Sequence, residues 1–322
     1  MDWSDRIGRR LKLRDLHTLR VVARRGSMAK AAAELALSQP AVSKAIADME
    51  RTLGVRLLDR MPTGIEPTLY GRALLKWEVA VFDDLRQAVK EIDFLADPSS
   101  GELRIGAVEP MLSGLVPAII DRLSRQYPRI AFHVSYASAP DRFRELRERK
   151  LDLVIGRVPS RVADDDLDVA ILFDEPMFVV AGVQNRWVRR RKIELFELVE
   201  EPWSLPEPDT LVASFIEEAF RASGMNVPRS GVIANSIQVH CALLATGRFL
   251  AMLPGSLLRF GAERLSLKVL PVKLKCRPTP VGIVCLKNRT ITPLAQRFID
   301  CARTLVIPLD EASLGENTGQ SN

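Results

Sequence analysis

Histidine, cysteine and long apolar runs are scarce in this 322-residue sequence. Its three histidines, His17, His133 and His240, are too few and too scattered for a metal cluster or a histidine-based catalytic site. No apolar run approaches the roughly 20 residues that a membrane-spanning helix needs. The N-terminus is polar and basic, and the apolar core of a secretory signal does not follow it. We therefore expect a protein of the cytoplasm that binds no metal and enters no membrane.

The cysteines number only four, all of them after residue 240, and they form no C-x-x-C motif. Buried thiols are the ordinary interpretation in a reducing compartment. The alternative is a redox switch that pairs Cys241 with another cysteine.

Motifs of common catalytic sites are absent as well. The sequence has neither the phosphate-binding G-x-x-x-x-G-K-[ST] nor the nucleophile motif G-x-S-x-G. The acidic run at 164–166 suggests a cation site, but a solvated loop explains it more simply. No pair of groups suits acid–base catalysis, so we expect neither an enzyme nor a cofactor.

The positive charge is concentrated at one end of the chain. Residues 1–70 hold 13 basic and 8 acidic side chains, whereas the remainder holds 33 and 32. A length of 322 residues favours two or three compact units. Together these facts indicate a small unit that binds a polyanion, joined to a larger unit with another task.

Residues 13–54 are predicted to form three short helices. The first ends at Gly26, Ser27 caps the second, and Ser38 caps the third. Pro40 falls in the first turn of the third helix, where its missing N–H costs nothing. The alanines of this stretch let two short helices cross closely, as a helix-turn-helix requires.

The outer face of the third helix carries Gln39, Ser43 and Lys44, whose side chains suit base edges and phosphates. A helix-turn-helix presents this helix end to the major groove. The alternative is an ordinary helical hairpin with a solvated polar face. Residues 55–71 then read as a two-stranded wing, with Arg60 at its base.

A long helix is predicted from about residue 69 to residue 96, with Thr68 as its cap. Apolar residues follow one another at steps of three and four, and Glu78 interrupts them. The predicted seam consists of Leu74, Val81, Leu85, Ala88, Ile92 and Leu95. Such a stripe favours dimerisation with a partner helix. Packing against the C-terminal part of the same chain is the alternative.

The C-terminal part alternates strands and helices after a hinge at 97–101. Strands are predicted at 103–108, 130–137 and 151–156, and helices at 113–126 and 141–149. This order is typical of a parallel α/β architecture. Further strands are expected near 168–173, 177–182, 249–254, 266–271 and 281–286, and helices near 194–199, 210–223, 236–246 and 293–305. The polar tail at 309–322 is expected to be disordered.

The stretch AAAELALSQPAVSKAIADMERTLGVRLLDR, with PTLYG after it, resembles the winged helix-turn-helix of the LysR-type transcriptional regulators. Pro67 departs from the family's usual Leu and leaves the exit angle of the wing in doubt. The resemblance implies DNA contacts by Ser27, Ser38, Gln39, Pro40, Ser43, Lys44 and Arg60.

The same resemblance extends over the rest of the chain through GELRIG, LDLVIG and GRFLAMLP. It implies an α/β protein whose C-terminal part has two subdomains like those of periplasmic binding proteins, with crossovers near 173–174 and 271–275. The expected domains are a winged helix-turn-helix (1–70), a linker helix (71–97) and an effector-binding domain (98–308) before the tail. Subdomain one would comprise 101–172 and 276–307, and subdomain two 173–275.

Ligands of such folds bind between the subdomains, outside the carboxyl ends of strands. The Ser, Thr and Asn candidates could equally be helix caps, and Arg157 could form an inter-subdomain ion pair. Glu109 and Asp209 favour a hydroxyl-rich ligand over a purely anionic one. The candidate effector residues are Glu109, Ser113, Ser135, Ser138, Arg157, Thr210, Asn235 and Ser236.

The resemblance implies a bacterial one-component regulator that binds double-stranded operator DNA and a small-molecule effector. It also implies a homotetramer built from dimers paired through the linker helix, with RNA polymerase as a further candidate partner. A sugar or aromatic-acid catabolic operon is the expected target. The alternatives are a redox-sensing regulator of the same fold and a cytoplasmic small-molecule-binding protein without operator specificity.

Overall fold

The computed structural model describes residues 10–62, 64–137, 142–158, 165–208, 210–229 and 231–306. The chain divides into two compact units, Met1–Val89 and Lys90–Asn322. In the described part of the chain, no helix is long and apolar enough to cross a membrane, and no three His, Cys, Asp or Glu side chains are grouped to hold a metal. The predicted tail at 309–322 lies outside the described residues.

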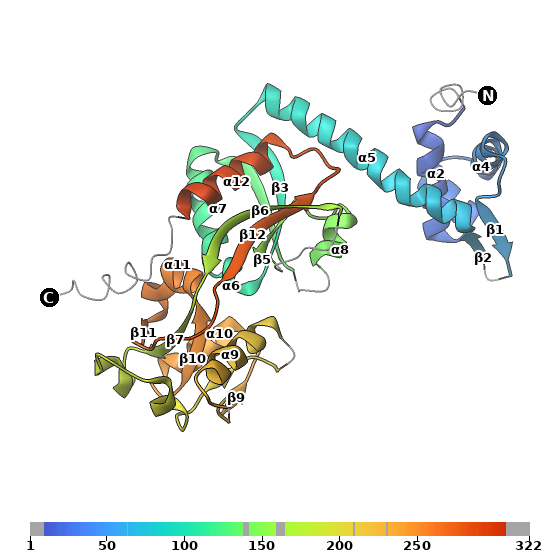
Figure 1. Cartoon of the computed structure of the whole chain (residues 1–322). Helices are drawn as coiled ribbons and strands as arrows, with labels where there is room; N and C mark the ends of the chain where they lie inside the picture. Colours follow the sequence, from blue (N-terminus) through green and yellow to red (C-terminus); the bar gives the residue numbers. More distant parts are fainter. Residues whose placement is uncertain are drawn as a thin grey trace. The chain divides into compact units, whose positions relative to one another are not determined.

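The described part of the first unit contains three short helices followed by a hairpin, as its spacing predicts. Their buried faces share one apolar core, to which Leu19, Val42 and Met49 contribute fully buried side chains. The elements are α2 (Leu13–Arg25), α3 (Met28–Glu34), α4 (Gln39–Leu53), β1 (Leu58–Met61) and β2 (Gly64–Pro67) (Figure 1).

The hairpin is fixed to the helices by backbone groups. Gly26 ends α2 in the left-handed conformation (φ 62°), and its carbonyl accepts the Ile65 N–H at 2.9 Å. On the other side, Glu50 Oε1 accepts the backbone N–H groups of Leu57 (2.8 Å) and Leu58 (3.3 Å). The wing therefore has a fixed position relative to α4.

The long helix α5 (Leu69–Ala96) starts directly after the hairpin. Thr68 caps it, because the Thr68 hydroxyl accepts the Gly71 N–H at 3.0 Å and donates to the Arg56 carbonyl at 2.7 Å. A β-carbon at Gly71 would lie 2.0 Å from the Leu57 carbonyl oxygen. Only glycine therefore fits there. The close approach of α5 to β1 follows directly after the last strand pair of the hairpin, Leu58 with Pro67.

The second unit contains two large sheets and one two-stranded sheet. The first has the strand order β4-β3-β5-β12-β6. Its strands are β3 (Ser100–Ala107), β4 (Arg129–Tyr136), β5 (Leu153–Arg157), β6 (Leu167–Glu175) and β12 (Thr279–Leu286). Strands β4, β3 and β5 are parallel as predicted, but β12 runs antiparallel to both β5 and β6. The sheet is mixed because β12 re-enters it from the other half of the unit.

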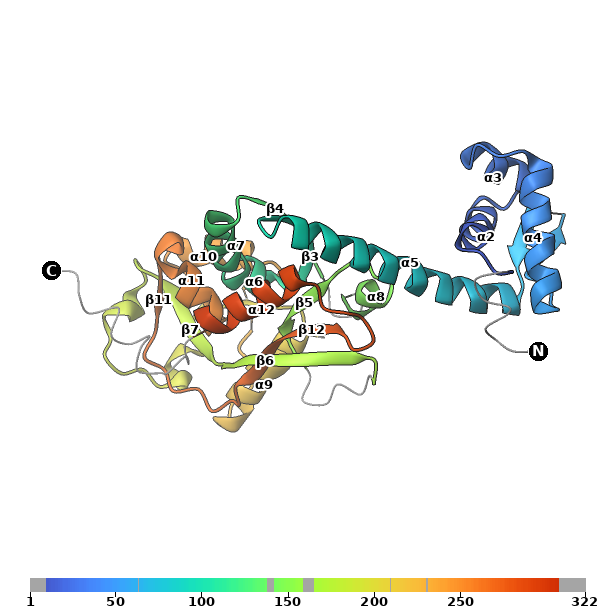
Figure 2. The same ribbon diagram turned by 90° about the horizontal axis from the view of Figure 1, so that it is seen from above.

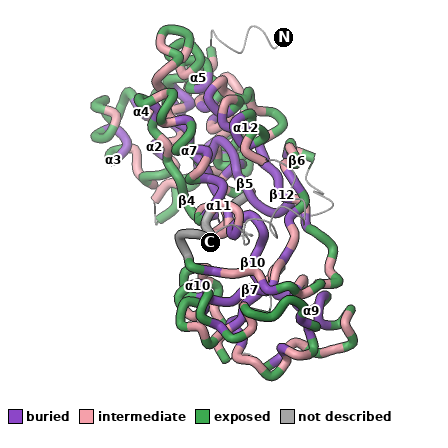
Figure 3. The backbone as a smooth tube through the Cα atoms, turned by 90° about the vertical axis from the view of Figure 1, so that its left-hand side faces the viewer, coloured by how far each residue is buried: buried purple, intermediate pink, exposed green. Residues whose placement is uncertain are grey.

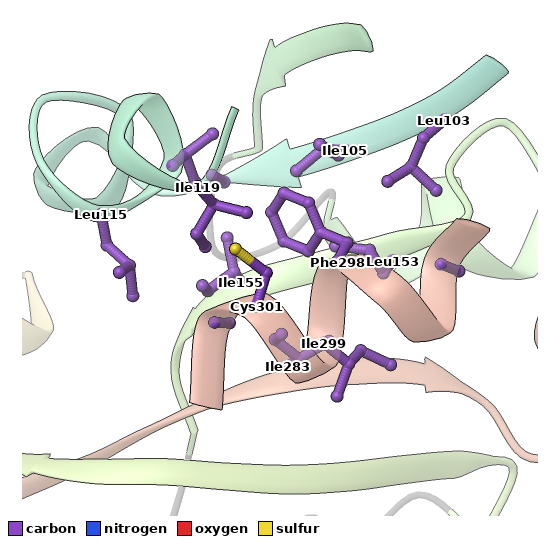
Figure 4. Packing of buried hydrophobic residues seen from close by; sticks show 14 of the residues in the cluster. Leu103, Ile105, Leu115, Ile119, Leu153, Ile155, Ile283, Phe298, Ile299 and Cys301 are labelled. Carbon is purple, nitrogen blue, oxygen red and sulfur yellow. The ribbon is translucent and has the colours of Figure 1, made fainter. Parts of the chain in front are cut away.

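Helices cover both faces of this first sheet. Helices α7 (Leu115–Gln126) and α12 (Pro293–Leu305) pack on one face, where Ile105, Ile119 and Phe298 meet in the main core (Figure 4). Helix α8 (Arg142–Arg147) lies over the other face and buries Leu146 (Figure 2). The predicted helix 113–126 is present as α7, and a short helix that was not predicted, α6 (Glu109–Leu112), precedes it.

The second sheet has the order β10-β7-β11, from Leu250–Pro254, Met177–Gly182 and Leu267–Val269, with both neighbours antiparallel to β7. Helix α9 (Leu211–Ala222) packs on one face, and α10 (Ile237–Ala245) and α11 (Gly255–Leu265) pack on the other. Strands β5, β7, β10 and β12 are buried along most of their length, whereas β4 at the sheet edge is largely exposed (Figure 3). The sequence did not predict α11, and the short strands β8 (Ser204–Leu205) and β9 (Val232–Ile233) were also not foreseen.

Two connections join the sheets. Pro176 alone separates β6 from β7, and residues 270–278 separate β11 from β12. Both lie close to the crossovers that the resemblance implies.

The end of α5 is held against the first sheet's helices by Arg297 of α12. Its guanidinium carbon lies 4.5 Å from the ring centroid of Phe94 and 4.3 Å from that of Tyr127. The same side chain donates to the Pro98 carbonyl at 2.6 Å. Three segments that are far apart in the sequence thus meet at one cation.

Candidate functional site

The N-terminal end of α4 exposes the side chains that suit DNA. Ser38 caps the helix, with its hydroxyl accepting the Ala41 N–H at 3.3 Å, and Pro40 lies in the first turn. Gln39 and Lys44 are exposed, and Ser43 is half-buried. Ser27 caps α3 in the same way, accepting the Lys30 N–H at 3.4 Å.

Much of the basic charge near this face is already used. Arg24 and Arg25 both form ion pairs with Glu34, and the hydrogen bond from Arg25 is the main cause that lowers the pKa of that carboxyl. Among the described residues, none forms an ion pair with Lys44 or Arg60, and both are exposed. Lys44 on α4 and Arg60 on β1 are therefore available for phosphate.

The apolar seam of α5 is exposed from its third turn onward. Trp77 is 69% exposed and Ile92 64% exposed. Leu74, predicted as the first seam residue, instead packs against the core of the first unit. Trp77 takes its place, four residues before Val81, so the seam consists of Trp77, Val81, Leu85, Ala88, Ile92 and Leu95.

Glu78 does not interrupt the seam, because its side chain is buried on another face of α5. It is 1% exposed, and its Oε1 lies 3.3 Å from Arg20 Nε of α2. Burial raises the pKa of Glu78, and Arg20 opposes that shift. This ion pair links the linker helix to α2.

A cavity of about 430 Å³ lies between the two sheets of the second unit. Apolar side chains make up most of its wall, among them Tyr136, Val212 and Met252. Such a composition, with a few polar groups, is typical of small-ligand sites. The polar side chains in the wall are those of Glu109, Arg157, Glu175, Thr210, Asn235 and His240.

Glu109 joins the two halves of this cavity. It lies in α6, where the sequence predicted a loop, and its Oε1 accepts the Ile237 N–H at 2.8 Å and the Ser236 hydroxyl at 3.2 Å. Ile237 is the first residue of α10, so the carboxylate sits at the positive end of that helix. A residue of the first half thus caps a helix of the second half.

Arg157 forms its ion pair within the first sheet rather than between the halves. It ends β5, and its Nε lies 3.5 Å from Oε2 of Glu175, which ends β6. Arg157 is 7% exposed and Glu175 is 1% exposed. Burial lowers the pKa of Arg157 and raises the pKa of Glu175. Glu175 Oε1 accepts the Ser256 N–H at 3.1 Å.

The other predicted effector residues are divided between the cavity and other places. Thr210 caps α9, and Asn235 Oδ1 accepts the Glu207 N–H at 3.1 Å, while both line the cavity. Ser113 and Ser135 are not among the residues that line it. Ser138 lies outside the described residues, as does Asp209.

Two lining residues were missed by the sequence prediction. His240 is buried in α10, and its Nδ1 lies 2.7 Å from the Ser204 hydroxyl. Burial lowers the pKa of His240, so the ring is neutral at pH 7. Glu175 is the last residue of a strand and directly precedes a crossover. That position is the only sequence signal that could have marked Glu175 as a residue of the cavity wall.

All four thiols are free, and burial is the main cause that raises the pKa of each. For Cys241 and Cys285 the pKa is raised to about 11. Because the thiolate is the reactive form, such sites are poor redox sensors.

Comparison with known proteins agrees with both parts of the molecule. Residues 13–72 match the family of bacterial regulatory helix-turn-helix proteins of the lysR family, and residues 96–306 match the LysR substrate binding domain. The regulator GbpR of Azospirillum brasilense is 28% identical over 91% of this chain and 86% of its own. The SDS degradation transcriptional activation protein of a Pseudomonas species is 29% identical over 88% of this chain and 93% of its own.

Solved structures share the fold at low identity. A full-length OxyR from Pseudomonas aeruginosa superposes with a TM-score of 0.60 at 20% identity, covering 91% of this chain and 95% of its own. Full-length CbnR in complex with its target DNA superposes with a TM-score of 0.52 at 19% identity, covering 91% of this chain and 99% of its own. With two family models together covering most of its length, the chain belongs to the LysR family of bacterial transcriptional regulators.

Proposed function

We propose that this regulator reads its operator with the N-terminal end of α4 and responds to a small molecule in the cavity of the second unit. The observation that carries the proposal is the free, exposed pair of Gln39 and Lys44 at a capped helix start. Gln can bond an adenine edge in two places, and Lys neutralises a phosphate. Ser27, Ser38, Pro40, Ser43 and Arg60 complete the proposed contact surface.

The chain is proposed to act in the cytoplasm as a dimer through the α5 seam, with two dimers forming a tetramer. Six exposed seam positions on one face of α5 support the dimer. RNA polymerase is a candidate partner of the DNA-bound form. The redox alternative is not favoured, because burial raises the pKa of every thiol.

Substitution of Gln39 and Lys44 tests the DNA contacts. Lys44→Ala should weaken binding to all sequences and reduce the salt dependence by about one phosphate charge. Gln39→Ala should instead lower the preference for the operator over altered sites, by about 1–3 kcal/mol at one base pair. Fluorescence anisotropy over a salt series, on operator and point-altered duplexes, measures both.

Arg51→Ala serves as the matched control, because Arg51 lies in the last turn of α4 and is paired with Asp48. It should leave the affinity and the salt slope nearly unchanged. If Gln39→Ala and Lys44→Ala behave like this control, the proposed reading face is wrong.

A further inference from the structure

The start of α10 is occupied by a carboxylate of the chain itself. Helix N-termini bind anions, and in this cavity the Ile237 N–H and the Ser236 hydroxyl already donate to Glu109 Oε1 at 2.8 and 3.2 Å. A carboxylate on a ligand would have to displace Glu109 or lie beside it. The helix end that could otherwise take an acid is therefore closed to one.

The charges of the remaining wall also disfavour an acid. The lining residues include two carboxylates, Glu109 and Glu175, against one guanidinium, Arg157, which Glu175 already balances at 3.5 Å. His240, the other ionisable base in the wall, is bonded to Ser204 at 2.7 Å. An anionic ligand would enter a cavity in which carboxyl groups outnumber the guanidinium.

The guanidinium of Arg157 is only weakly hydrogen-bonded within the chain. Its side chain is only 7% exposed, and its Nε faces Glu175 Oε2 at 3.5 Å without the geometry of a hydrogen bond. Its Nη2 donates only to the sulfur of Met177 at 3.0 Å, and sulfur is a weak acceptor. A ligand that lies against Arg157 is expected to supply neutral acceptor atoms.

An acceptor without a donor lies in the same cavity. Glu109 Oε2 accepts no hydrogen bond from a described residue, whereas Glu175 Oε2 already faces Arg157 Nε at 3.5 Å. The Asn235 side chain uses its oxygen for the Glu207 N–H, so its amide N–H groups remain as donors. The wall thus offers both hydrogen-bond donors and hydrogen-bond acceptors. An ammonium group only donates and a carboxylate only accepts, so neither can bond to both kinds of group.

We propose that the cavity takes an uncharged, polyhydroxylated small molecule of sugar type, and that Glu109 is the residue that selects it over the corresponding acid. A hydroxyl group both donates and accepts, so one group can serve Arg157 and a carboxylate oxygen at once. The volume of about 430 Å³ is at the small end of ligand sites, and Tyr136 and Met252 give it an apolar side. This inference rests on the proposed function, because it takes the cavity as the ligand site of the regulator.

Calorimetric titration of the full-length protein tests the ligand class. The probes are matched sets on one carbon skeleton: the common aldohexoses and aldopentoses, their aldonic acids and their 2-amino derivatives, with benzoate as an aromatic acid. A neutral sugar should bind at least about tenfold more tightly than its acid and its amine. Tighter binding of any acid, or no neutral sugar that binds more tightly than about 1 mM, overturns the inference.

Glu109→Gln tests the selecting residue. The amide oxygen can still accept from Ile237, so the fold is kept, but the negative charge is lost. The preference for sugar over aldonic acid should fall at least about tenfold. Glu102→Gln is the control, since Glu102 lies on β3 outside the cavity wall. An unchanged preference in Glu109→Gln would remove Glu109 from the inference.

Operator binding in the same preparations separates this inference from the proposed function. A sugar that binds but leaves operator affinity and footprint unchanged would contradict the proposal that the cavity ligand controls DNA binding. It would still support the inference that the ligand is of sugar type. An acid that binds and alters the footprint would keep the control and overturn the class.

Discussion

At the scale of single residues, Arg20 and Glu78 connect α2 to α5. The Glu78 carboxylate is buried, whereas the Arg20 side chain is 40% exposed. Arg20 also lies beside the His17 ring nitrogen, at 3.0 Å, and its guanidinium lies 5.7 Å from the ring centroid of Phe82. Loss of Arg20 therefore leaves a buried carboxylate without its cation.

Arg20→Ala should lower the free energy of unfolding of the first unit by about 1–3 kcal/mol, less than for a fully buried pair because Arg20 is partly solvated. In a Glu78→Gln background the same substitution should cost clearly less. Urea denaturation of the four proteins gives the coupling energy. Equal losses in both backgrounds would show that the ion pair contributes nothing.

His240 gives the ligand-binding unit a dependence on pH. Burial lowers the pKa of His240 in the folded protein, whereas the unfolded ring titrates near 6.5. Between these two values the unfolded state binds more protons, so this residue's contribution to stability falls as the pH drops below about 6.5. Above that value its contribution is fully present.

His240→Asn removes the titration and keeps a group that can bond Ser204. The difference in unfolding free energy between wild type and variant should therefore shrink when the pH is lowered from about 8 to about 5.5. Chemical denaturation at several pH values measures it. A difference that stays constant over this range would contradict the prediction.

The thiols provide a further test at this scale. Because burial raises the pKa of Cys241 and Cys285 to about 11, little thiolate exists at pH 7. The folded protein should keep all four free thiols after brief peroxide treatment. Thiol titration in denaturant, before and after treatment, counts them, and a loss of two would restore the redox hypothesis.

Residues with local partners were predictable from the sequence. Ser27, Ser38 and Thr68 cap helices that follow them directly, so spacing alone indicates their role. Glu50 and Glu109 were not assigned their partners, because Leu57 and Ile237 come from other elements. The seam likewise shifted from Leu74 to Trp77, since the sequence does not tell which face of α5 the first unit covers.

At the scale of elements, the α5 seam is the most direct prediction. Leu85 lies in the middle of the seam and is 44% exposed. The next residue, Arg86, lies off the seam. Leu85→Gln should weaken self-association at least about tenfold, because a dimer would lose two buried leucines. Arg86→Gln is the matched control. Sedimentation equilibrium compares them, and equal association constants would place the dimer contact elsewhere.

The elements themselves were largely predictable, with one clear exception. Helix α11 contains Gly255 and Gly261, which lower helix propensity and hide its pattern. It forms because Leu257 and Leu258 are buried against the second sheet, and that sheet is assembled from distant segments. The antiparallel course of β12 was missed for the same reason, since strand direction depends on the return crossover.

At the scale of the whole molecule, the two compact units should respond to ligands separately. A ligand at about 100 times its dissociation constant stabilises the unit that binds it by about 2.7 kcal/mol. A cavity ligand should therefore raise the unfolding transition of Lys90–Asn322 and leave that of Met1–Val89 in place. Operator DNA should do the reverse.

Differential scanning calorimetry with hydrogen exchange assigns each transition to its unit. A fragment of residues 90–306 should retain the ligand response and lose DNA binding. A single transition that both ligands shift equally would show that the units unfold as one.

Arg297, held between the rings of Phe94 and Tyr127, makes the last turn of α5 a fixed part of the first sheet's layer. The contacts of Arg297 hold that turn against α7 and α12. We expect any movement of the second sheet relative to the first to be taken up at Pro176 and at residues 270–278, because these segments connect the two sheets. The end of α5 is then expected to move together with the first sheet and its helices as one body.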